Sequence, residues 1–168
     1  MQRTLDQPVP DPSVRVPVVV DLLKETEVDE YINFRPNANP SEIRSLLTRG
    51  DRCFVARHEG QVVHACWATT SYAWIDYLAR RIQLAPDEAY TYDIFTLPAF
   101  RGQNIVSTVM SVHVIPYFRG AGFRRMITSV LPENKASIRG LRKAGYQPFG
   151  VMGCVKLGPW RRDFFRLI

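Results

Sequence analysis

The sequence predicts an α/β domain with a central mixed β-sheet flanked by helices. Strand-like and helix-like segments alternate along the chain, and one polar turn links a strand directly to an apolar helix. The 168 residues, 46% of them hydrophobic, suit one packed domain. We expect this domain to span residues 13–168. Residues 1–12 are polar and contain Pro8, Pro10 and Pro12, so we expect a flexible leader there.

The first elements are a strand and a helix. Residues 15–23 are rich in valine and predict a strand, which Pro17 confines to an edge or a bulge. Residues 25–38 predict irregular or partly helical structure. A helix begins after Asn39, a favourable N-cap, and ends at Gly50.

A hairpin and an insertion follow. Residues 53–57 and 62–69 predict two strands joined by the turn 58–61, because β-branched and aromatic residues flank a glycine-containing turn. Residues 71–89 form a less regular insertion, with a short helix expected around residues 75–82.

The middle of the chain predicts a strand, a turn and a helix. Residues 90–97 are dense in Tyr, Ile, Phe and Thr, which favour strands, and Pro98 ends the strand. The polar turn 99–104 leads into an apolar helix over residues 105–115, which Pro116 must end or kink.

The last third predicts a strand at residues 124–130 and a helix at residues 135–144. One or two closing strands then cover residues 146–157. The tail 159–168 mixes aromatic residues with arginines, so it either packs on the core or forms a contact surface.

The turn before the helix at residue 105 has the features of an anion site. Backbone N–H groups in the first turn of a helix have no partner within the helix, and the helix dipole adds partial positive charge there. Gly102 permits close approach of a ligand, Arg101 adds a charge, and Ser107 and Thr108 add hydroxyl donors. A pyrophosphate would suit this group. An ordinary turn with a surface arginine explains the same residues equally well.

From about residue 51 to residue 149 the sequence resembles the GNAT acyltransferases. The hairpin at 53–63 resembles their central strand pair, and the segment YDIFTLPAFRG at 92–102 resembles the strand that opens their pyrophosphate loop. The elements PENKASIR at 132–139 and KAGY at 143–146 match the motif that follows downstream in the family.

This resemblance implies a GNAT-type sheet that splays open where two parallel strands part. It also implies direct transfer of an acyl group from acetyl-CoA or another acyl-CoA to a primary amine of a small molecule or peptide. The residues implied to bind the cofactor are Phe95, Thr96, Leu97, Arg101, Gly102, Gln103, Asn104, Ile105, Val106, Ser107, Asn134 and Ser137. Asn134 equally suits a helix cap.

Two positions depart from the family pattern. Val106 is branched where a small residue normally lets phosphate oxygens reach the amides, and Leu141 stands where many members carry a proton-donating tyrosine. A non-catalytic acyl-CoA-binding module, acting as a sensor or interaction domain, therefore remains an alternative to an enzyme.

The candidate bases are Asp93 and His64, since an ammonium must lose a proton before it attacks a thioester. A structural ion pair would equally explain Asp93, and a hydrogen-bonded core histidine would explain His64. Strand alternation places Tyr90 and Tyr92 on the side opposite Asp93.

The acceptor pocket is expected between the segments 25–38 and 71–89. Four aromatic residues would line it or pack in the core: Trp67, Tyr72, Trp74 and Tyr77.

Composition narrows the remaining classes. The net charge is +6, but Lys and Arg are spread along the chain, so we expect a basic surface and no nucleic-acid partner. Cys53, Cys66 and Cys154 are odd in number and far apart, which favours free thiols in a reducing compartment and no metal site. The sequence shows neither a membrane-length apolar run nor a secretory signal, so we expect a cytoplasmic protein. Whether it forms a homodimer is left open.

Overall fold

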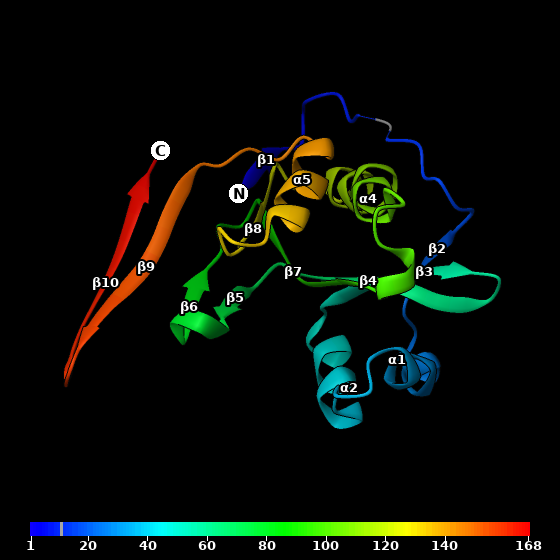
Figure 1. The fold of residues 1–168 in the computed structure, drawn as a ribbon, viewed down its shortest axis with the longest axis horizontal. Coiled ribbons are helices and arrows are strands. Elements are labelled where there is room, and N and C mark those ends of the chain that lie inside the picture. Colours follow the sequence, from blue (N-terminus) through cyan, green and yellow to red (C-terminus); the bar gives the residue numbers. More distant parts are fainter. Residues whose placement is uncertain (11) are drawn as a thin grey trace.

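The structure is a computed structural model that describes residues 1–10 and 12–168. A six-stranded sheet in the order β1-β8-β7-β4-β3-β2 crosses the molecule, with helices on both faces (Figure 1). Its strands are β1 (Gln2–Thr4), β2 (Val19–Leu22), β3 (Arg52–His58), β4 (Gln61–Thr69), β7 (Glu88–Thr96) and β8 (Arg125–Thr128). Strands β7 and β8 are parallel, while the other neighbouring pairs are antiparallel. The predicted α/β class with a mixed sheet is confirmed.

Two layers of helices bury the sheet. One face is covered by a continuous helical segment made of α3 (Ile105–Thr108), the π-helical stretch η4 (Val109–Val114) and α4 (Ile115–Gly120), together with α5 (Lys135–Lys143) (Figure 1). The other face is covered by α1 (Val28–Phe34) and α2 (Pro40–Arg49) (Figure 1). Each interface has its own apolar cluster, the first around Met110 and Leu141 and the second around Tyr31 and Trp67. The strands of the central hairpin are therefore buried on both faces.

Several predicted elements form as expected. Strand β2 lies at the edge of the sheet, where the proline before it removes no ladder hydrogen bond. Helix α2 begins at Asn39, whose side chain accepts a hydrogen bond from the Ser41 amide at 2.9 Å. It ends at Gly50, which has the left-handed φ of 97° that favours glycine.

The helix that Pro116 was expected to end or kink does not end there but continues to Gly120. The π-helical stretch η4 directly precedes Pro116. Its hydrogen bonds span five residues and not four, so the pairing of amides with carbonyls shifts at the position where proline lacks an N–H. Pro116 therefore lies inside a continuous helix, directly after the π-helical stretch that adjusts the backbone around it.

The expectation of a flexible leader does not describe the start of the chain. Within residues 1–12, of which Asp11 lies outside the described residues, Gln2–Thr4 form β1 and pair with β8. Arg3 is buried and donates to three carbonyl oxygens, those of Ala144, Gln7 and Pro8. A short polar strand of this kind is stabilised by distant carbonyls, which local sequence patterns do not reveal.

Two hairpins stand outside the main sheet. In the insertion, β5 (Tyr72–Ile75) and β6 (Arg80–Gln83) enclose the single 3₁₀ turn η2 (Asp76–Leu78), so the helix expected there is limited to that turn. Strands β9 (Gly150–Leu157) and β10 (Trp160–Leu167) form a hairpin that stands apart from the six-stranded sheet (Figure 1). The closing strand was expected, and the tail after residue 158 proves to be its partner.

Candidate active site

The parallel strands β7 and β8 part in the middle of the sheet. Their register runs from Glu88 opposite Arg125 to Thr91 opposite Thr128, and β7 then continues alone to Thr96. The two strands diverge beyond this point, which leaves one edge of β7 facing an opening. This is the splayed sheet that the resemblance implied.

Strand β7 carries a bulge at the same place. On β4, Ala65 pairs with Phe95 and Trp67 pairs with Tyr92, so Asp93 and Ile94 together oppose the single residue between. Asp93 has a φ of 40°, in the left-handed region that non-glycine residues seldom occupy. Because the bulge breaks strict alternation, Tyr90, Tyr92 and Asp93 all face the same cavity. The expectation that the two tyrosines face away from Asp93 was therefore wrong.

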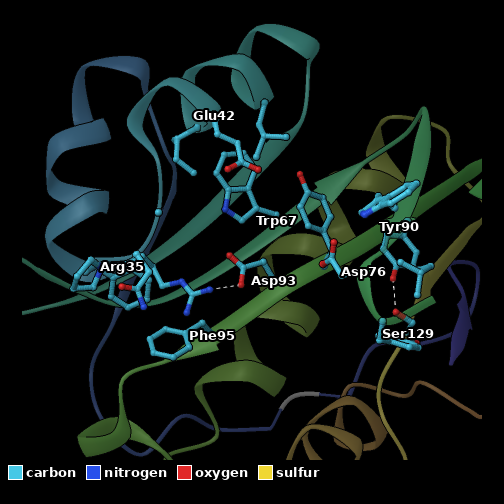
Figure 2. A pocket seen from close by; sticks show the side chains of 18 residues that line it. Arg35, Glu42, Trp67, Asp76, Tyr90, Asp93, Phe95 and Ser129 are labelled. Carbon is cyan, nitrogen blue, oxygen red and sulfur yellow. Dashed lines mark hydrogen bonds and ion pairs between the residues drawn. The ribbon is translucent and has the colours of Figure 1, made fainter. Parts of the chain in front are cut away.

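That cavity has a volume of about 640 Å³ and lies between β7, the α1–α2 region and the β5–β6 hairpin. Figure 2 shows aromatic walls with carboxylates between them. Both segments expected to border an acceptor pocket contribute, through Arg35 and Trp74 among others. Trp67 and Tyr77 also line the cavity, whereas Tyr72 instead lies under the guanidinium groups of Arg49 and Arg81.

Asp93 is held from two sides but stays partly exposed to the cavity. Its Oδ1 accepts from Arg35 Nη2 at 2.6 Å, as Figure 2 shows, and its Oδ2 lies 3.4 Å from the Tyr31 hydroxyl. The Tyr31 hydroxyl accepts from Trp67 Nε1 at 2.8 Å, and Arg35 rests on the Phe95 ring. Both proposed readings of Asp93 remain compatible with this geometry, because it forms an ion pair and still presents a carboxylate to the cavity.

A polar network fixes Tyr92, which forms part of the aromatic wall of this cavity. The Tyr92 hydroxyl donates to Asp51 Oδ2 at 2.5 Å, and Arg49 Nε donates to the other carboxylate oxygen at 3.2 Å. Burial and the adjacent carboxylate both raise the pKa of Tyr92, so this hydroxyl stays protonated and acts as a fixed donor. The Tyr92 ring stacks between Trp67 and Tyr90, which orders the aromatic wall.

His64 lies in the core of the sheet. It is fully buried, it lines neither of the two cavities described here, and its Nδ1 is 2.8 Å from the Thr96 hydroxyl. Burial lowers its pKa to about 3, so the imidazole is neutral at ordinary pH. An acceptor amine in the cavity therefore has no direct path to this imidazole, and Asp93 is the candidate base that the geometry retains.

A second cavity, of about 510 Å³, lies on the other side of the opening between α3, α5 and the end of β7. Of the residues predicted to bind the cofactor, all line it except Leu97 and Gln103. Asn134 also caps α5, accepting from the Ser137 amide at 3.0 Å, so the cap leaves it among the residues that line the cavity. Phe95 lines both cavities, which places it at their junction.

The loop at the mouth of the second cavity has the backbone of an anion site. Gly102 and Asn104 are both left-handed, with φ of 78° and 63°, and the amides of the first turn of α3, which follows, have no partner within the helix. The segment before β2 braces this loop: the Arg15 amide donates to the Gln103 carbonyl at 3.0 Å, and the Asn104 side chain donates to the Ser13 carbonyl at 3.2 Å.

The charge around this cavity is positive. Arg101 lines it while donating to the Thr96 carbonyl at 3.2 Å, and Arg139 and Lys143 line it from α5. Arg139 and Lys143 were not among the residues predicted to bind the cofactor. Their spacing of four, on the helix that follows Asn134, is the signal that would have placed them on one face.

Val106 is accommodated by a glycine on the facing helix. An ideal Cβ on Gly140 would lie 3.4 Å from Val106 Cγ1, so the two helices approach closely here and the branched side chain is directed at α5. The second departure is also clear: Leu141 is buried in the core, as is Tyr146. Hydroxyl groups do border the first cavity, where Tyr90 and Ser129 form a hydrogen bond of 2.5 Å beside the point at which β7 and β8 part.

The model of the acetyltransferase (GNAT) family matches residues 19–146, well over half of the chain. The chain belongs to this family. The resemblance drawn from the motifs, and with it the assignment as an enzyme, is thereby confirmed, and the alternative of a non-catalytic module gains no support. No curated protein matches the sequence.

Solved acetyltransferases share the fold of this GNAT protein. The aminoglycoside 6'-N-acetyltransferase AAC(6')-Ih from Acinetobacter baumannii is 17% identical, with a TM-score of 0.61 over 78% of this chain and 91% of its own. AAC(6')-Iy in complex with CoA is 18% identical, with a TM-score of 0.61 over 77% and 91%. The GNAT domain of S. lividans PAT is 16% identical, with a TM-score of 0.65 over 94% and 97%.

Two further observations concern metals and membranes. Within residues 1–10 and 12–168, no group of three or more His, Cys, Asp and Glu side chains is placed to hold a metal ion. In the same part of the chain, no helix is long and apolar enough to cross a membrane.

Proposed function

We propose that this GNAT protein transfers an acetyl group from acetyl-CoA to a primary amine of a small acceptor, with the acceptor in the first cavity and the cofactor in the second. The observation that carries the proposal is the pair of cavities meeting at Phe95, where the sheet parts. One is aromatic and contains carboxylates, and the other is cationic and borders the first turn of α3. The solved neighbour in complex with CoA supports the cofactor.

The second cavity suits the diphosphate of coenzyme A. Its described lining includes Arg101, Arg139 and Lys143 but no carboxylate, and the loop amides supply fixed donors. When bound, acetyl-CoA supplies the activated acyl group. The chain contributes mainly by holding the acyl group and the amine together at the junction.

Asp93 would accept the proton that the amine must lose, directly or through one water molecule. Its carboxylate is partly exposed to the acceptor cavity, and Arg35 and Tyr31 fix its orientation. Tyr90 and Ser129 would return a proton to the departing thiolate, which Leu141 cannot do. The net result is an amide and the free thiol of coenzyme A.

The acceptor cavity favours a cation with more than one amino group. Glu42, Asp76 and Asp93 line it against the single guanidinium of Arg35, although the whole chain carries a net charge of +6. Glu42 and Asp76 form no ion pair among the described residues, so they are free to bind ammonium groups. The neighbouring aminoglycoside acetyltransferases support a small polyamine or aminosugar as acceptor.

A turnover assay tests this proposal. Purified protein, acetyl-CoA and a panel of mono- and polyamines are combined, and free thiol is measured beside a calorimetric titration with CoA. We expect Asp93→Asn to lower kcat/KM by roughly 10²- to 10⁴-fold while CoA binding is kept. Asp21→Asn, which replaces an exposed acid on β2, is the matched control. CoA binding without transfer to any amine would overturn the proposal, as would full activity of Asp93→Asn.

A further inference from the structure

The hairpin of β9 and β10 has one face turned away from the domain. Directly paired residues of two antiparallel strands lie on the same face. The pairs of one face, called here the outer face, are Val151 with Arg166, Gly153 with Phe164, Val155 with Arg162, and Leu157 with Trp160.

The contacts that tie the hairpin to the domain come from the opposite, inner face, although Phe165 and Leu167 of that face are exposed as well. Met152 on that face packs against the cluster around Ile75 and Leu78, and the Arg161 guanidinium donates to the Leu78 carbonyl. The apolar side chains of the outer face are exposed, and Trp160 reaches 80% exposure. A two-stranded hairpin in water is marginally stable by itself, so an uncovered apolar face points to a partner.

The exposed area is what a dimer would use. The five apolar residues of the outer face are between 45% and 80% exposed. A complete aromatic side chain offers roughly 150–250 Å², and valine and leucine offer less, so together they expose on the order of 600 Å². This lies at the upper limit for the largest apolar patch of an ordinary monomer, about 300–600 Å². It also approaches the roughly 800 Å² per partner of a standard protein interface, before the stems of the two arginines are added.

The order of residues along the outer face makes it complementary to itself. A twofold axis that lies between the two outer faces and runs perpendicular to the strands stacks the base of one copy on the tip of the other. Arg166 then faces Trp160 of the partner subunit, and Arg162 faces Phe164 of the partner subunit, so each guanidinium meets an aromatic ring and not a second arginine. The end of the Phe164 ring already lies over Gly153, since an ideal Cβ there would be 2.6 Å from it.

We propose that the outer face is a homodimer interface, in which the β9–β10 hairpins of two copies stack antiparallel about a twofold axis. This inference does not depend on the proposed acceptor or cofactor. A nucleic acid or an anionic membrane is a less suitable partner for this face. Its two arginines are separated by apolar side chains, and the residues paired with them on β9 carry no charge.

Light scattering after size exclusion of the full chain, over a wide dilution series, tests the dimer. We expect wild-type protein to have twice the mass of one chain, and the double variant Trp160→Glu with Phe164→Glu to halve it. Val112→Glu, at a similarly exposed apolar position on η4, is the matched control and stays dimeric. Circular dichroism and thermal melting show whether each variant is folded, and the melting temperature of the wild type should depend on concentration while that of the double variant should not.

The arginines give a second, milder test. Arg162→Glu with Arg166→Glu should weaken the dimer without exposing new apolar surface. A wild type that is monomeric at every concentration overturns the inference, including the case in which that monomer binds vesicles of anionic lipid or generic nucleic acid. A folded Trp160→Glu, Phe164→Glu protein that stays dimeric overturns it as well, because another surface would then hold the copies together.

Discussion

Replacing Gly145 with alanine should destabilise the protein far more than the same change at Gly50. Both glycines have a left-handed backbone, with φ of 83° and 97°, so each change costs about 1–2 kcal/mol in backbone strain. At Gly50 an added Cβ meets no atom within 4 Å. At Gly145 it would lie 1.5 Å from Nη1 of Arg3, and the guanidinium must move.

The extra cost follows from what holds Arg3. The guanidinium ends a flexible side chain, but it is buried and donates to the carbonyls of Ala144 at 2.8 Å and Pro8 at 2.7 Å. Hydrogen bonds from a charged group contribute about 1.5–3 kcal/mol each, so displacing it should add on the order of 3 kcal/mol to the backbone strain. That is a large fraction of the roughly 5–15 kcal/mol that stabilises a domain.

Urea unfolding at neutral pH measures both free energies. The variant Arg3→Met provides a double-mutant cycle: once the guanidinium is gone, Gly145→Ala should cost no more than Gly50→Ala. The reasoning is refuted if the two alanine variants lose the same stability in the wild-type background, since Arg3 would then move aside freely. If the Gly145→Ala chain does not fold, the cost of that change can still be measured in the Arg3→Met background and compared with that of Gly50→Ala.

Four further outcomes are expected. His64 binds a proton below about pH 6.5 when unfolded but only near pH 3 when folded, so the free energy of unfolding falls as pH drops through this window. His64→Asn should make the slope of this free energy against pH shallower by about 1.4 kcal/mol per pH unit. An unchanged slope would show that His64 is not buried and neutral. Val106→Ala should change the dissociation constant of CoA less than about threefold, because its branched side chain is directed at Gly140 of α5, and a change of about half a kcal/mol is then expected. A tenfold tightening would show that the side chain blocks the amides. Glu42→Gln and Asp76→Asn should each raise KM for a polyamine by about fivefold, because a partly exposed charge pair contributes up to about 1 kcal/mol. The kcat and the KM for a monoamine should be unchanged. Equal effects on both amines would show that these two carboxylates do not select cations. Tyr90→Phe should lower kcat and leave CoA binding intact if its hydroxyl returns the proton, and an unaltered kcat would assign that step to water.

Periodicity and turn chemistry determined much of this protein from its sequence. The cap at Asn39, the glycine that ends α2, the β3–β4 hairpin and the loop before α3 all depend on neighbouring residues, and each formed where predicted. The turn at residues 99–104 could be located for the same reason: its left-handed positions, Gly102 and Asn104, are residue types that tolerate that backbone.

Tertiary structure alone decided which side chains share a cavity. The bulge at Asp93 rotates β7 so that Tyr90, Tyr92 and Asp93 point together, and it forms because β4 has one residue fewer in the paired stretch. Likewise β1 owes its place to carbonyls more than a hundred residues away, and His64 is neutral only because strands and helices enclose it. Local patterns report on contacts within a few residues, whereas burial and register depend on how distant segments meet, so the sequence could name the candidates but not choose between them.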